Sequence, residues 1–302
     1  MGKLSVVISA FNEEKKIEDC LKSVSFADEI IFVDNSSTDK TEEIARKYTE
    51  NIYEQKNDPS AIDLQKNFGF TKASHEWILS IDADEEVSKK LADEIRTRIK
   101  NNVKENGFWI PRKNIIFGKW IEHTGWYPDY QLRLFKKGKG KFKEKHVHKI
   151  IKLDGESEKL KSPIIHYNYE NISQFLQKML LYTENEANQL IEKGYNLAWQ
   201  DSIRFPTKEF VSRFFAREGF KDGLRGLVLS LLMAFYHLVV FVNIWEKLKF
   251  KQIEDEKFLS EVKEEFVKGH KEIFFWFLKI SIDKTRDPLK KLVLRIKSKI
   301  SQ

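Results

Sequence analysis

The stretch WILSIDADEE, residues 77–86, holds the strongest chemical signal in the chain, because an apolar run ends directly in a group of acids. If the backbone is still extended there, Asp82 and Asp84 face the same side and can share one divalent cation. Carboxylate oxygens suit Mg²⁺ or Mn²⁺, which proteins hold together with the phosphates of a substrate. Glu85 and Glu86 are predicted to flank the next helix, whose dipole favours negative charge there, and Glu85 could also support the metal site.

Two further residues could take part in the same chemistry. Asp34 ends the apolar run EIIFVD, where a carboxylate can accept hydrogen bonds from a nucleobase or a ribose. It could instead begin a turn, since the polar run NSSTD follows it. Lys66, in LQKNFG, could supply a cation to a diphosphate or be one more lysine that faces solvent.

The elements that would position these residues alternate along the first hundred positions. Apolar runs typical of strands occupy 4–10, 29–34, 51–54 and 77–82, and helical patterns cover 15–24, 36–48, a segment from Pro59 onward and 88–100. This alternation predicts a parallel sheet covered on both faces by helices. Ligands bind such sheets outside the carboxyl ends of the strands, which is where Asp34, Asp82 and Asp84 fall.

The rest of the chain changes character twice. From Gly107 to about Tyr169, short strand-like pieces look antiparallel, with KKGKGK predicted as a hairpin turn. Beyond Asn171 helical patterns dominate, around 172–193, 207–219, 222–248, 254–268, 271–282 and 287–299. The sequence thus predicts an α/β domain over 1–170 and a helical extension over 171–302.

The charge is unevenly spread. The chain has 302 residues and a formal net charge of +7, and the segments 135–149 and 290–300 are strongly basic. They suit an anionic partner such as a phosphorylated sugar or an anionic membrane surface, or they form a lysine-rich solvated surface. Nucleic acid is disfavoured as a partner, because lysine dominates over arginine and aromatic residues. With Cys20 as the only cysteine and no signal-peptide pattern at the start, a reducing cytoplasm is expected.

One helical segment is apolar enough to concern a membrane. Gly226–Trp245 carries no formal charge, and as a helix it spans about 30 Å, the thickness of a bilayer core. Ser230, His237 and Asn243 interrupt it. It is therefore a membrane-embedded or interfacial helix, a buried core or dimer helix, or a single span. The aromatic run at 273–280 is flanked by lysines, which is typical of a helix lying among lipid headgroups. The same run could instead pack on the domain.

Several motifs together carry a family resemblance. SVVISAFNEE, EIIFVDNSSTDKT, LQKNFG and SIDADE, in this order and spacing, resemble the family 2 glycosyltransferases with a GT-A fold. GWYPDYQLRLFKKGKGKF, IIHYNY and REGFKDGLRGLVLSLLMAFY are similar to a bacterial branch that includes lipopolysaccharide-core β-1,4-glucosyltransferases. The resemblance implies a Rossmann-like α/β fold, mostly parallel with a small antiparallel part, plus a helical extension. It divides 1–170 into a nucleotide-sugar half, 1–100, and an acceptor half, 101–170.

The resemblance also implies roles for individual residues. Asp84 would hold the metal, Mn²⁺ or Mg²⁺, which neutralises charge on the departing nucleoside diphosphate. The nucleotide would be bound by Ala10, Phe11, Asn12, Glu13, Asp34, Lys66 and Asp82. Candidate contacts to the acceptor or the diphosphate are Trp126, Arg133 and His148.

An inverting transfer also needs a carboxylate that takes the proton from the acceptor hydroxyl. Many family members place it in an E-D pair after the D-x-D, and this chain has no such pair before its helical part. Asp129 is the expected base, with Glu122, Glu144 and Asp154 as alternatives. The chain also has VHK at 147–149 where the branch has V-H-E, which puts the activity or the acceptor type in question.

The function expected from the resemblance is metal-dependent transfer of a hexose, glucose from UDP-glucose first, onto a lipopolysaccharide-core or other cell-envelope saccharide. The protein would be cytoplasmic and peripheral at the inner membrane. One alternative is a polyprenyl-phosphate glycosyltransferase, for which two membrane-spanning helices would be expected. Another is a catalytically inactive relative that only binds the nucleotide-sugar.

Overall fold

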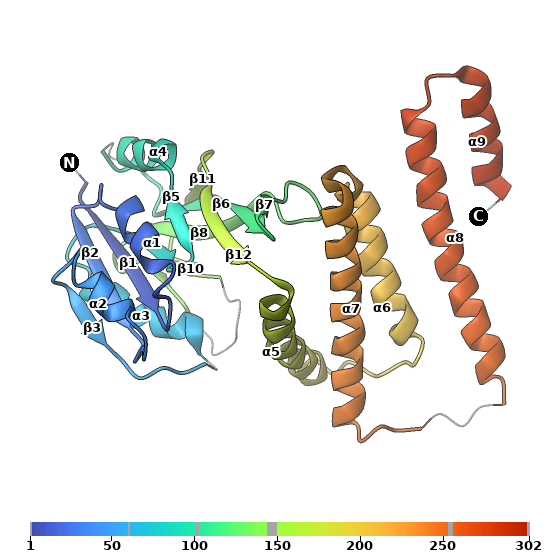
Figure 1. The fold of residues 1–302 in the computed structure, drawn as a ribbon, viewed down its shortest axis with the longest axis horizontal. Helices are drawn as coiled ribbons and strands as arrows, with labels where there is room; N and C mark the ends of the chain where they lie inside the picture. Colours follow the sequence, from blue (N-terminus) through green and yellow to red (C-terminus); the bar gives the residue numbers. More distant parts are fainter. Residues whose placement is uncertain (1, 60, 101–102, 144–149, 253–255, 301–302) are drawn as a thin grey trace. The chain divides into compact units, whose positions relative to one another are not determined.

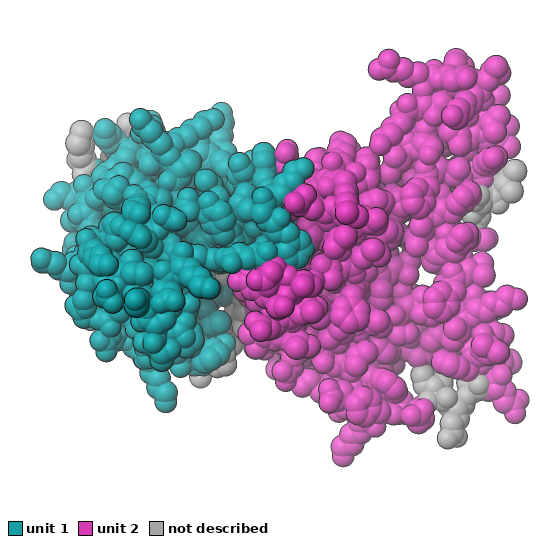
Figure 2. Space-filling view, viewed as in Figure 1, with its two compact units in different colours: residues 1–120, 126–170 teal, residues 121–125, 171–302 magenta. Residues whose placement is uncertain are grey.

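The computed structural model describes residues 2–59, 61–100, 103–143, 150–252 and 256–300. The chain divides into two compact units, which Figure 2 shows in different colours. Unit 1 comprises residues 1–120 and 126–170, and unit 2 comprises residues 121–125 and 171–302. The short segment 121–125 therefore belongs to the helical unit, although its neighbours in the sequence belong to unit 1.

Unit 1 is built on one mixed β-sheet (Figure 1). Its described strands follow the order β3-β2-β1-β4-β8-β6-β12-β5, with β7 and β11 also paired to β6. The strands of this sheet are β1 (Leu4–Ala10), β2 (Glu29–Asp34), β3 (Ile52–Glu54), β4 (Trp77–Asp82), β5 (Glu85–Val87), β6 (Gly107–Ile116), β7 (Lys119–Trp120), β8 (Asp129–Lys136), β11 (Ser157–Lys159) and β12 (Ile164–Tyr169).

The first four strands form the parallel part of the sheet. β1 lies between β2 and β4 and runs parallel to both, while β3 runs parallel to β2. Residues of α1 (Ile17–Ser23), α2 (Thr41–Ala45) and α4 (Lys89–Lys100) pack with one face, and α3 (Ile62–Lys72) packs with the other. The predicted parallel sheet with helices on both faces is confirmed. α3 begins at Ile62, because Pro59 lies in the turn that precedes it.

The second half of unit 1 is only partly antiparallel, which corrects the prediction. β8 runs antiparallel to β4 and to β6, but β11 and β12 run parallel to β6. A hydrophobic pattern indicates a strand but not its direction, so the sequence could not distinguish these cases. KKGKGK does form a turn after β8, but β9 (Gly140–Lys141) then pairs with β10 (Lys152–Leu153) rather than with β8.

Unit 2 is helical. Its helices are α5 (Ile172–Glu192), α6 (Asp201–Phe210), a π-helix (Val211–Ala216), a 3₁₀ turn (Gly219–Asp222), α7 (Gly223–Lys247), α8 (Phe258–Lys284) and α9 (Pro288–Ile300). The helix predicted from 207 begins earlier, at Asp201, and includes Pro206. The two helices predicted at 254–268 and 271–282 are the single helix α8, because a lone glycine such as Gly269 weakens a helix without ending it.

α7 uses its polar residues to pack within unit 2. Tyr236 donates a hydrogen bond to Glu186 of α5 at 2.9 Å, and Asn243 donates to Thr183 of α5 at 3.1 Å. His237 lies 3.7 Å from Glu209 of α6. α7 is the one helix among the described residues that is long and apolar enough to cross a membrane, which is weak evidence by itself. One side of α7 packs on α5 and α6, and the other exposes an apolar stripe of Leu224, Val228, Leu231, Phe235 and Val242.

Candidate active site

The carboxyl ends of the parallel strands bring the predicted acids to one edge of the sheet. β1 pairs with β2 so that Ala10 lies opposite Asp34, and with β4 so that Ser9 lies opposite Asp82. Parallel neighbours end at the same edge, so this pairing follows directly from the strand order β2-β1-β4.

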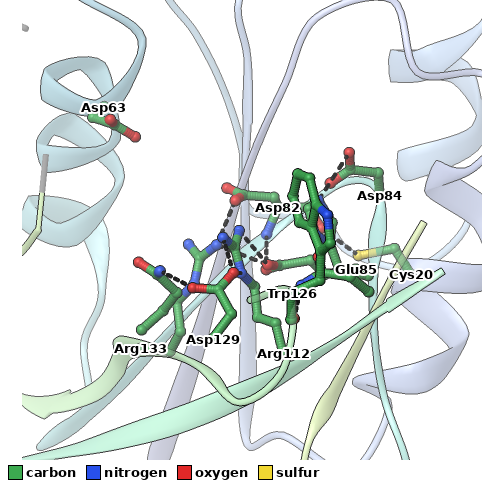
Figure 3. Close-up of polar contacts among 12 residues, drawn as sticks. Cys20, Asp63, Asp82, Asp84, Glu85, Arg112, Trp126, Asp129 and Arg133 are labelled. Carbon is green, nitrogen blue, oxygen red and sulfur yellow. Dashed lines mark hydrogen bonds and ion pairs between the residues drawn. The ribbon is translucent and has the colours of Figure 1, made fainter. Parts of the chain in front are cut away.

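Asp82 is held between two cations from distant elements, and Figure 3 labels Arg133, one of the two. Lys66 of α3 lies 2.6 Å from Oδ1 of Asp82, and Arg133 of β8 donates to its Oδ2 at 2.5 Å. Burial alone would raise the pKa of Asp82, but Arg133 and Lys66 outweigh it and hold the pKa well below its usual range. Asp82 is therefore ionised, and its charge is already matched by the protein.

Glu85 is a second carboxylate in this cluster and contacts both Asp82 and Arg133. It lies in β5 with no exposed surface, accepts a hydrogen bond from the Asp82 backbone N–H at 3.0 Å, and accepts another from Arg133 at 2.8 Å. The prediction that Glu85 flanks a helix is wrong, because Glu85 and Glu86 form a short strand that pairs with β12. Burying a carboxylate is unfavourable without such partners, so Arg133 stabilises both acids at once.

Asp84 lies on a turn after the strand rather than in the strand itself. β4 ends at Asp82, and the chain turns through Ala83 and Asp84 before β5. The extended geometry that would let the two carboxylates share one cation is thus absent. Oδ2 of Asp84 instead lies 3.5 Å from Nε2 of His166 in β12.

Asn114 fixes the state of the His166 ring. The Asn114 amide nitrogen donates to the carbonyl oxygen of Trp126 at 2.7 Å, so its amide oxygen faces Nδ1 of His166, also at 2.7 Å. Nδ1 must therefore carry the proton of that hydrogen bond. In a neutral ring Nε2 then has a lone pair directed toward Asp84, which is the orientation a metal ligand needs.

Asp34 is buried at the end of β2 with one oxygen engaged. Its Oδ2 accepts a hydrogen bond from the backbone N–H of Ser37 at 2.8 Å. Its Oδ1 is buried and has no hydrogen-bond partner. Asn12, with a left-handed backbone at φ 55°, ties the loop after β1 to the loop after β2 by accepting a hydrogen bond from Thr38 at 2.8 Å. A buried carboxylate oxygen that lacks a partner is poised to receive a donor from a ligand.

Comparison with known proteins identifies the family. Residues 5–151 match the model of glycosyl transferase family 2. An uncharacterized glycosyltransferase of Rickettsia bellii (strain RML369-C) is 30% identical over 260 residues, covering 81% of this chain and 86% of that protein. The chain belongs to the family 2 glycosyltransferases. The GT-A fold expected for this family, a mostly parallel sheet with a small antiparallel part, is confirmed.

Two other glycosyltransferases are similar. The lipopolysaccharide core biosynthesis glycosyltransferase LpsC of Rhizobium meliloti (strain 1021) is 24% identical over 252 residues, covering 81% of this chain and 92% of that protein. Among solved structures, glucosyl-3-phosphoglycerate synthase from Mycobacterium tuberculosis, in complex with Mg²⁺ and uridine diphosphate, gives a TM-score of 0.42 at 14% identity. That match covers 65% of this chain and 81% of that one.

Asp129 of this glycosyltransferase lies at the start of β8, beside the charged cluster (Figure 3). Arg112 of β6 donates to its Oδ2 through Nε at 2.8 Å, and Gln131 donates to its Oδ1 at 2.8 Å. Burial would raise the pKa of Asp129, but Arg112 and these hydrogen bonds lower it overall. Arg112 also lies 3.8 Å from Glu85, so Asp129 is linked to the cluster around Asp82.

The other candidate residues of the glycosyltransferase are distributed as follows. Of the alternative bases, Asp154 is exposed and pairs with Lys139 at 2.6 Å, and Glu122 belongs to unit 2. Glu144 and His148 lie outside the described residues. Ala10 is buried at the strand end, and Phe11 is exposed beyond it. Glu13 donates its backbone N–H to Thr41 at 2.7 Å.

Three residues that were not predicted as site residues also lie at the site of the glycosyltransferase: Arg112, Asn114 and His166. Each lies within a run that reads as an ordinary strand, so local patterns gave no reason to select it. IIHYNY, which contains His166, was one of the motifs that resembled the bacterial branch. That motif was the one available signal, and it did not indicate that His166 would face Asp84.

Proposed function

We propose that this family 2 glycosyltransferase transfers a hexose, glucose from UDP-glucose first, with inversion onto a lipopolysaccharide-core or other cell-envelope saccharide. The arrangement at the strand ends carries the proposal. Asp34 offers a buried carboxylate oxygen without a partner, and Asp84 faces His166 apart from the ion pairs that occupy Asp82. The similarity to LpsC supports the choice of acceptor class.

The nucleoside part of the donor would bind at Asp34. Its Oδ1 can accept a hydrogen bond from a donor group of the base or the ribose, which would satisfy a buried polar atom. Ala10, Phe11, Asn12 and Glu13 follow the strand that pairs with β2, and would border the base on that side. Lys66 and Arg133 already form ion pairs with Asp82. Any contact that they make with the diphosphate would be in addition to those ion pairs.

The diphosphate would need a divalent cation. Three cations, Lys66, Arg112 and Arg133, lie among five carboxylates, Asp63, Asp82, Asp84, Glu85 and Asp129, so the described cluster already carries excess negative charge. A donor diphosphate would add to this excess. Uncompensated negative charge of this kind repels an anionic ligand.

The residues present fit Mn²⁺ or Mg²⁺ held together with substrate. Asp84 offers a carboxylate and His166 a directed lone pair, and the described residues contain no group of three or more metal-binding side chains. Such cations are usually held by one or two protein groups plus phosphate oxygens. When bound, the cation would supply Lewis-acid stabilisation of the charge on the departing diphosphate.

Asp129 would take the proton from the acceptor hydroxyl. The lowered pKa means that this carboxylate is ionised at neutral pH and able to accept a proton, although Arg112 reduces its basicity. Arg112 and Gln131 hold it in a fixed orientation, and Trp126, whose carbonyl oxygen is bound by Asn114, precedes it in the same loop. Trp126 and the segment around it would contact the acceptor, together with His148.

The proposed acceptor implies that the protein works at a membrane. A saccharide on a lipid carrier or on lipid A lies at the cytoplasmic face of the inner membrane before export. We therefore propose a peripheral location there, with unit 2 as the membrane-associating part and unit 1 as the catalytic domain. The exposed apolar stripe of α7 and its packing on α5 and α6 support an interfacial helix rather than a single span.

The donor and metal proposal is tested by thermal unfolding. UDP should raise the melting temperature only when Mn²⁺ or Mg²⁺ is present, and Asp84→Asn should remove that increase, because the cation would lose its carboxylate. Asp154→Asn is the matched control, since Asp154 is exposed and pairs only with Lys139 among the contacts found. Stabilisation by UDP without metal, or in Asp84→Asn, would exclude the proposed site.

The two alternative functions are separated by their products. A polyprenyl-phosphate transferase would move the sugar to the lipid phosphate, so radiolabelled donor would appear in a lipid with no saccharide acceptor added. An inactive relative would show the metal-dependent UDP shift but neither hydrolysis nor transfer with any nucleotide-sugar. Transfer to a core saccharide, without labelling of the lipid phosphate, is the result expected here.

A further inference from the structure

The last helix of the chain, α9, has two chemically distinct sides. Pro288 begins it, and the preceding Asp287 caps it by accepting hydrogen bonds from the backbone N–H groups of Leu289 at 2.9 Å and Lys290 at 3.3 Å. Proline at the first position and an aspartate cap define a firm start. The first turn of α9 is therefore well defined.

The apolar side of α9 is not covered by the rest of the protein. Leu289, Leu292, Val293 and Ile296 share one helix face, since their spacing of three and four positions matches the helical repeat. Their exposed fractions are 77%, 56%, 52% and 52%. α9 packs along α8, yet this contact leaves the whole apolar stripe accessible.

The charged residues of α9 are all cationic. Lys290, Lys291, Arg295 and Lys297 lie outside the apolar stripe, together with Leu294 and Ser298, and the helix contains no aspartate or glutamate. A surface helix that served only solubility would mix both signs of charge. A helix whose charges are all basic and lie beside an exposed apolar stripe matches a surface that is anionic above and apolar beneath.

We propose that α9 docks in the plane of an anionic lipid surface, with its apolar stripe among the acyl chains and its basic residues against the headgroup phosphates. This inference rests on the proposed location at a membrane, and it names the segment that makes the contact. A protein partner with an acidic groove would offer the same charge, but the apolar stripe of α9 is exposed along its length and has basic residues beside it, which a lipid surface matches in both respects.

The proposed contact between α9 and lipid should be weak enough to be reversible. A helix of this length buries a limited apolar area, and each basic residue near an anionic bilayer contributes about fivefold in affinity. Binding requires both the buried apolar area and the attraction of the basic residues to the anionic lipid. It should therefore weaken with salt and should be slight on neutral lipid.

The test is co-sedimentation of the full-length protein with lipid vesicles. We expect binding to phosphatidylcholine vesicles doped with phosphatidylglycerol and little binding to phosphatidylcholine alone. Replacing three charges, Lys290→Gln, Lys291→Gln and Arg295→Gln, should weaken binding on the order of a hundredfold. Replacing Leu292→Ser and Val293→Ser should weaken it by at least about tenfold while keeping the charge.

A matched control removes the same number of charges elsewhere. Lys89→Gln, Lys90→Gln and Lys100→Gln change exposed lysines of α4 in unit 1 and should leave vesicle binding nearly unchanged. A second readout uses Ile296→Cys with an environment-sensitive dye. Cys20 is buried, so the dye would react at the new thiol, and its emission should shift to the blue only with anionic vesicles.

The outcomes separate this inference from the proposed function. If the protein binds anionic vesicles but the α9 variants bind equally well, α9 is not the docking segment and the membrane location stands. If the α4 variant weakens binding as much as the α9 variant, general charge explains it and the inference is overturned. If no vesicle is bound, the membrane location fails as well. The metal-dependent effect of UDP is measured without lipid and should persist in every variant.

Discussion

Asp82 and Asp84 are separated by a single residue in the sequence but are chemically different in the structure. Asp82 is ion-paired to Lys66 and Arg133, which hold its pKa well below the usual range. Asp84 lies on a turn beside His166, whose Nδ1 is committed to Asn114. Removing the charge of Asp82 would leave two buried cations with one carboxylate each, Lys66 with Asp63 and Arg133 with Glu85, which destabilises the fold. Removing the charge of Asp84 should affect ligand binding instead, so Asp84 is the cleaner position for testing the metal site.

Asp129 provides the residue-scale prediction for catalysis. Asp129→Asn keeps an oxygen for Arg112 but can no longer accept a proton, so transfer should fall by about a hundredfold or more. The metal-dependent rise in melting temperature with UDP should persist, because Asp129 does not hold the nucleotide. Turnover and melting are measured on the same preparations, with Asp93→Asn at an exposed position of α4 as control. Turnover retained in Asp129→Asn would move the base to another residue.

At the scale of elements, unit 2 depends on charges enclosed between helices. Glu209 of α6 is engaged by Arg213 of the π-helix, and His237 of α7 lies 3.7 Å away. Burial alone would raise the pKa of Glu209, but His237 and Arg213 lower it to about 2. Glu265 of α8 pairs in a similar way with Arg204 of α6, at 2.8 Å. These pairs join α6 to its neighbouring helices where apolar contacts alone would not fix the alignment.

The Glu209 pair predicts a pH dependence of stability. The pKa of Glu209 is lower in the folded protein than in the unfolded chain, so its stabilisation is complete above the unfolded value of 4.5 and is lost as the pH falls toward about 2. The loss amounts to up to about 3 kcal/mol. Chemical unfolding between pH 6 and roughly pH 3 measures it. Glu209→Gln should flatten this dependence relative to the native protein, and an unchanged slope would contradict the assigned pairing.

A second element-scale prediction concerns the start of α7. A methyl group at Gly226 would lie 1.8 Å from the carbonyl oxygen of Gly219, which is backbone and cannot move aside. Gly226→Ala should therefore destabilise unit 2 by at least about 2 kcal/mol. Gly269→Ala in α8 is the matched control, since its methyl group would meet only the Thr207 side chain at 3.3 Å. The control should be close to neutral, because alanine favours the helix. Urea unfolding followed by circular dichroism measures both, and equal midpoints would contradict the close contact.

At the scale of the whole molecule, the chain is two units with separate cores. The cores of unit 1 lie on the two faces of its sheet, whereas unit 2 is held by helix packing such as the contact of Ala187 with Val240 and Ile244. All of the proposed nucleotide and metal residues belong to unit 1. Unit 2 carries the apolar stripe of α7 and the basic helix α9. This division separates the proposed chemistry from the proposed membrane contact.

The division predicts two transitions in scanning calorimetry. UDP with Mn²⁺ should raise one transition only, because a ligand stabilises the part that binds it. Gly226→Ala should lower the other transition and leave the ligand-dependent one unchanged. A single transition that moves as a whole under both changes would show instead that the units unfold cooperatively.

The elements near the site were predictable to different degrees. β1, β2 and β4 were recognisable because each is a short, predominantly apolar run, as buried parallel strands are. β5 was not, because Glu85 and Glu86 look like a helix flank. They become a strand only because β12 arrives from about eighty residues later in the chain to pair with them. The register of β12 is set by its pairing with β6, and no local sequence pattern indicates that these two strands run parallel.

By itself, the sequence determined the parallel half of the sheet, the family, and the acids at the strand ends, because these follow from local hydrophobic runs and closely spaced motifs. Only the tertiary structure decided which acid is neutralised and which one faces a histidine. Lys66, Arg133 and His166 reach the strand ends from α3, β8 and β12, and no local pattern records where such distant elements meet. The two aspartates of WILSIDADEE therefore differ because Coulomb interactions depend on distance in space, not on distance along the chain.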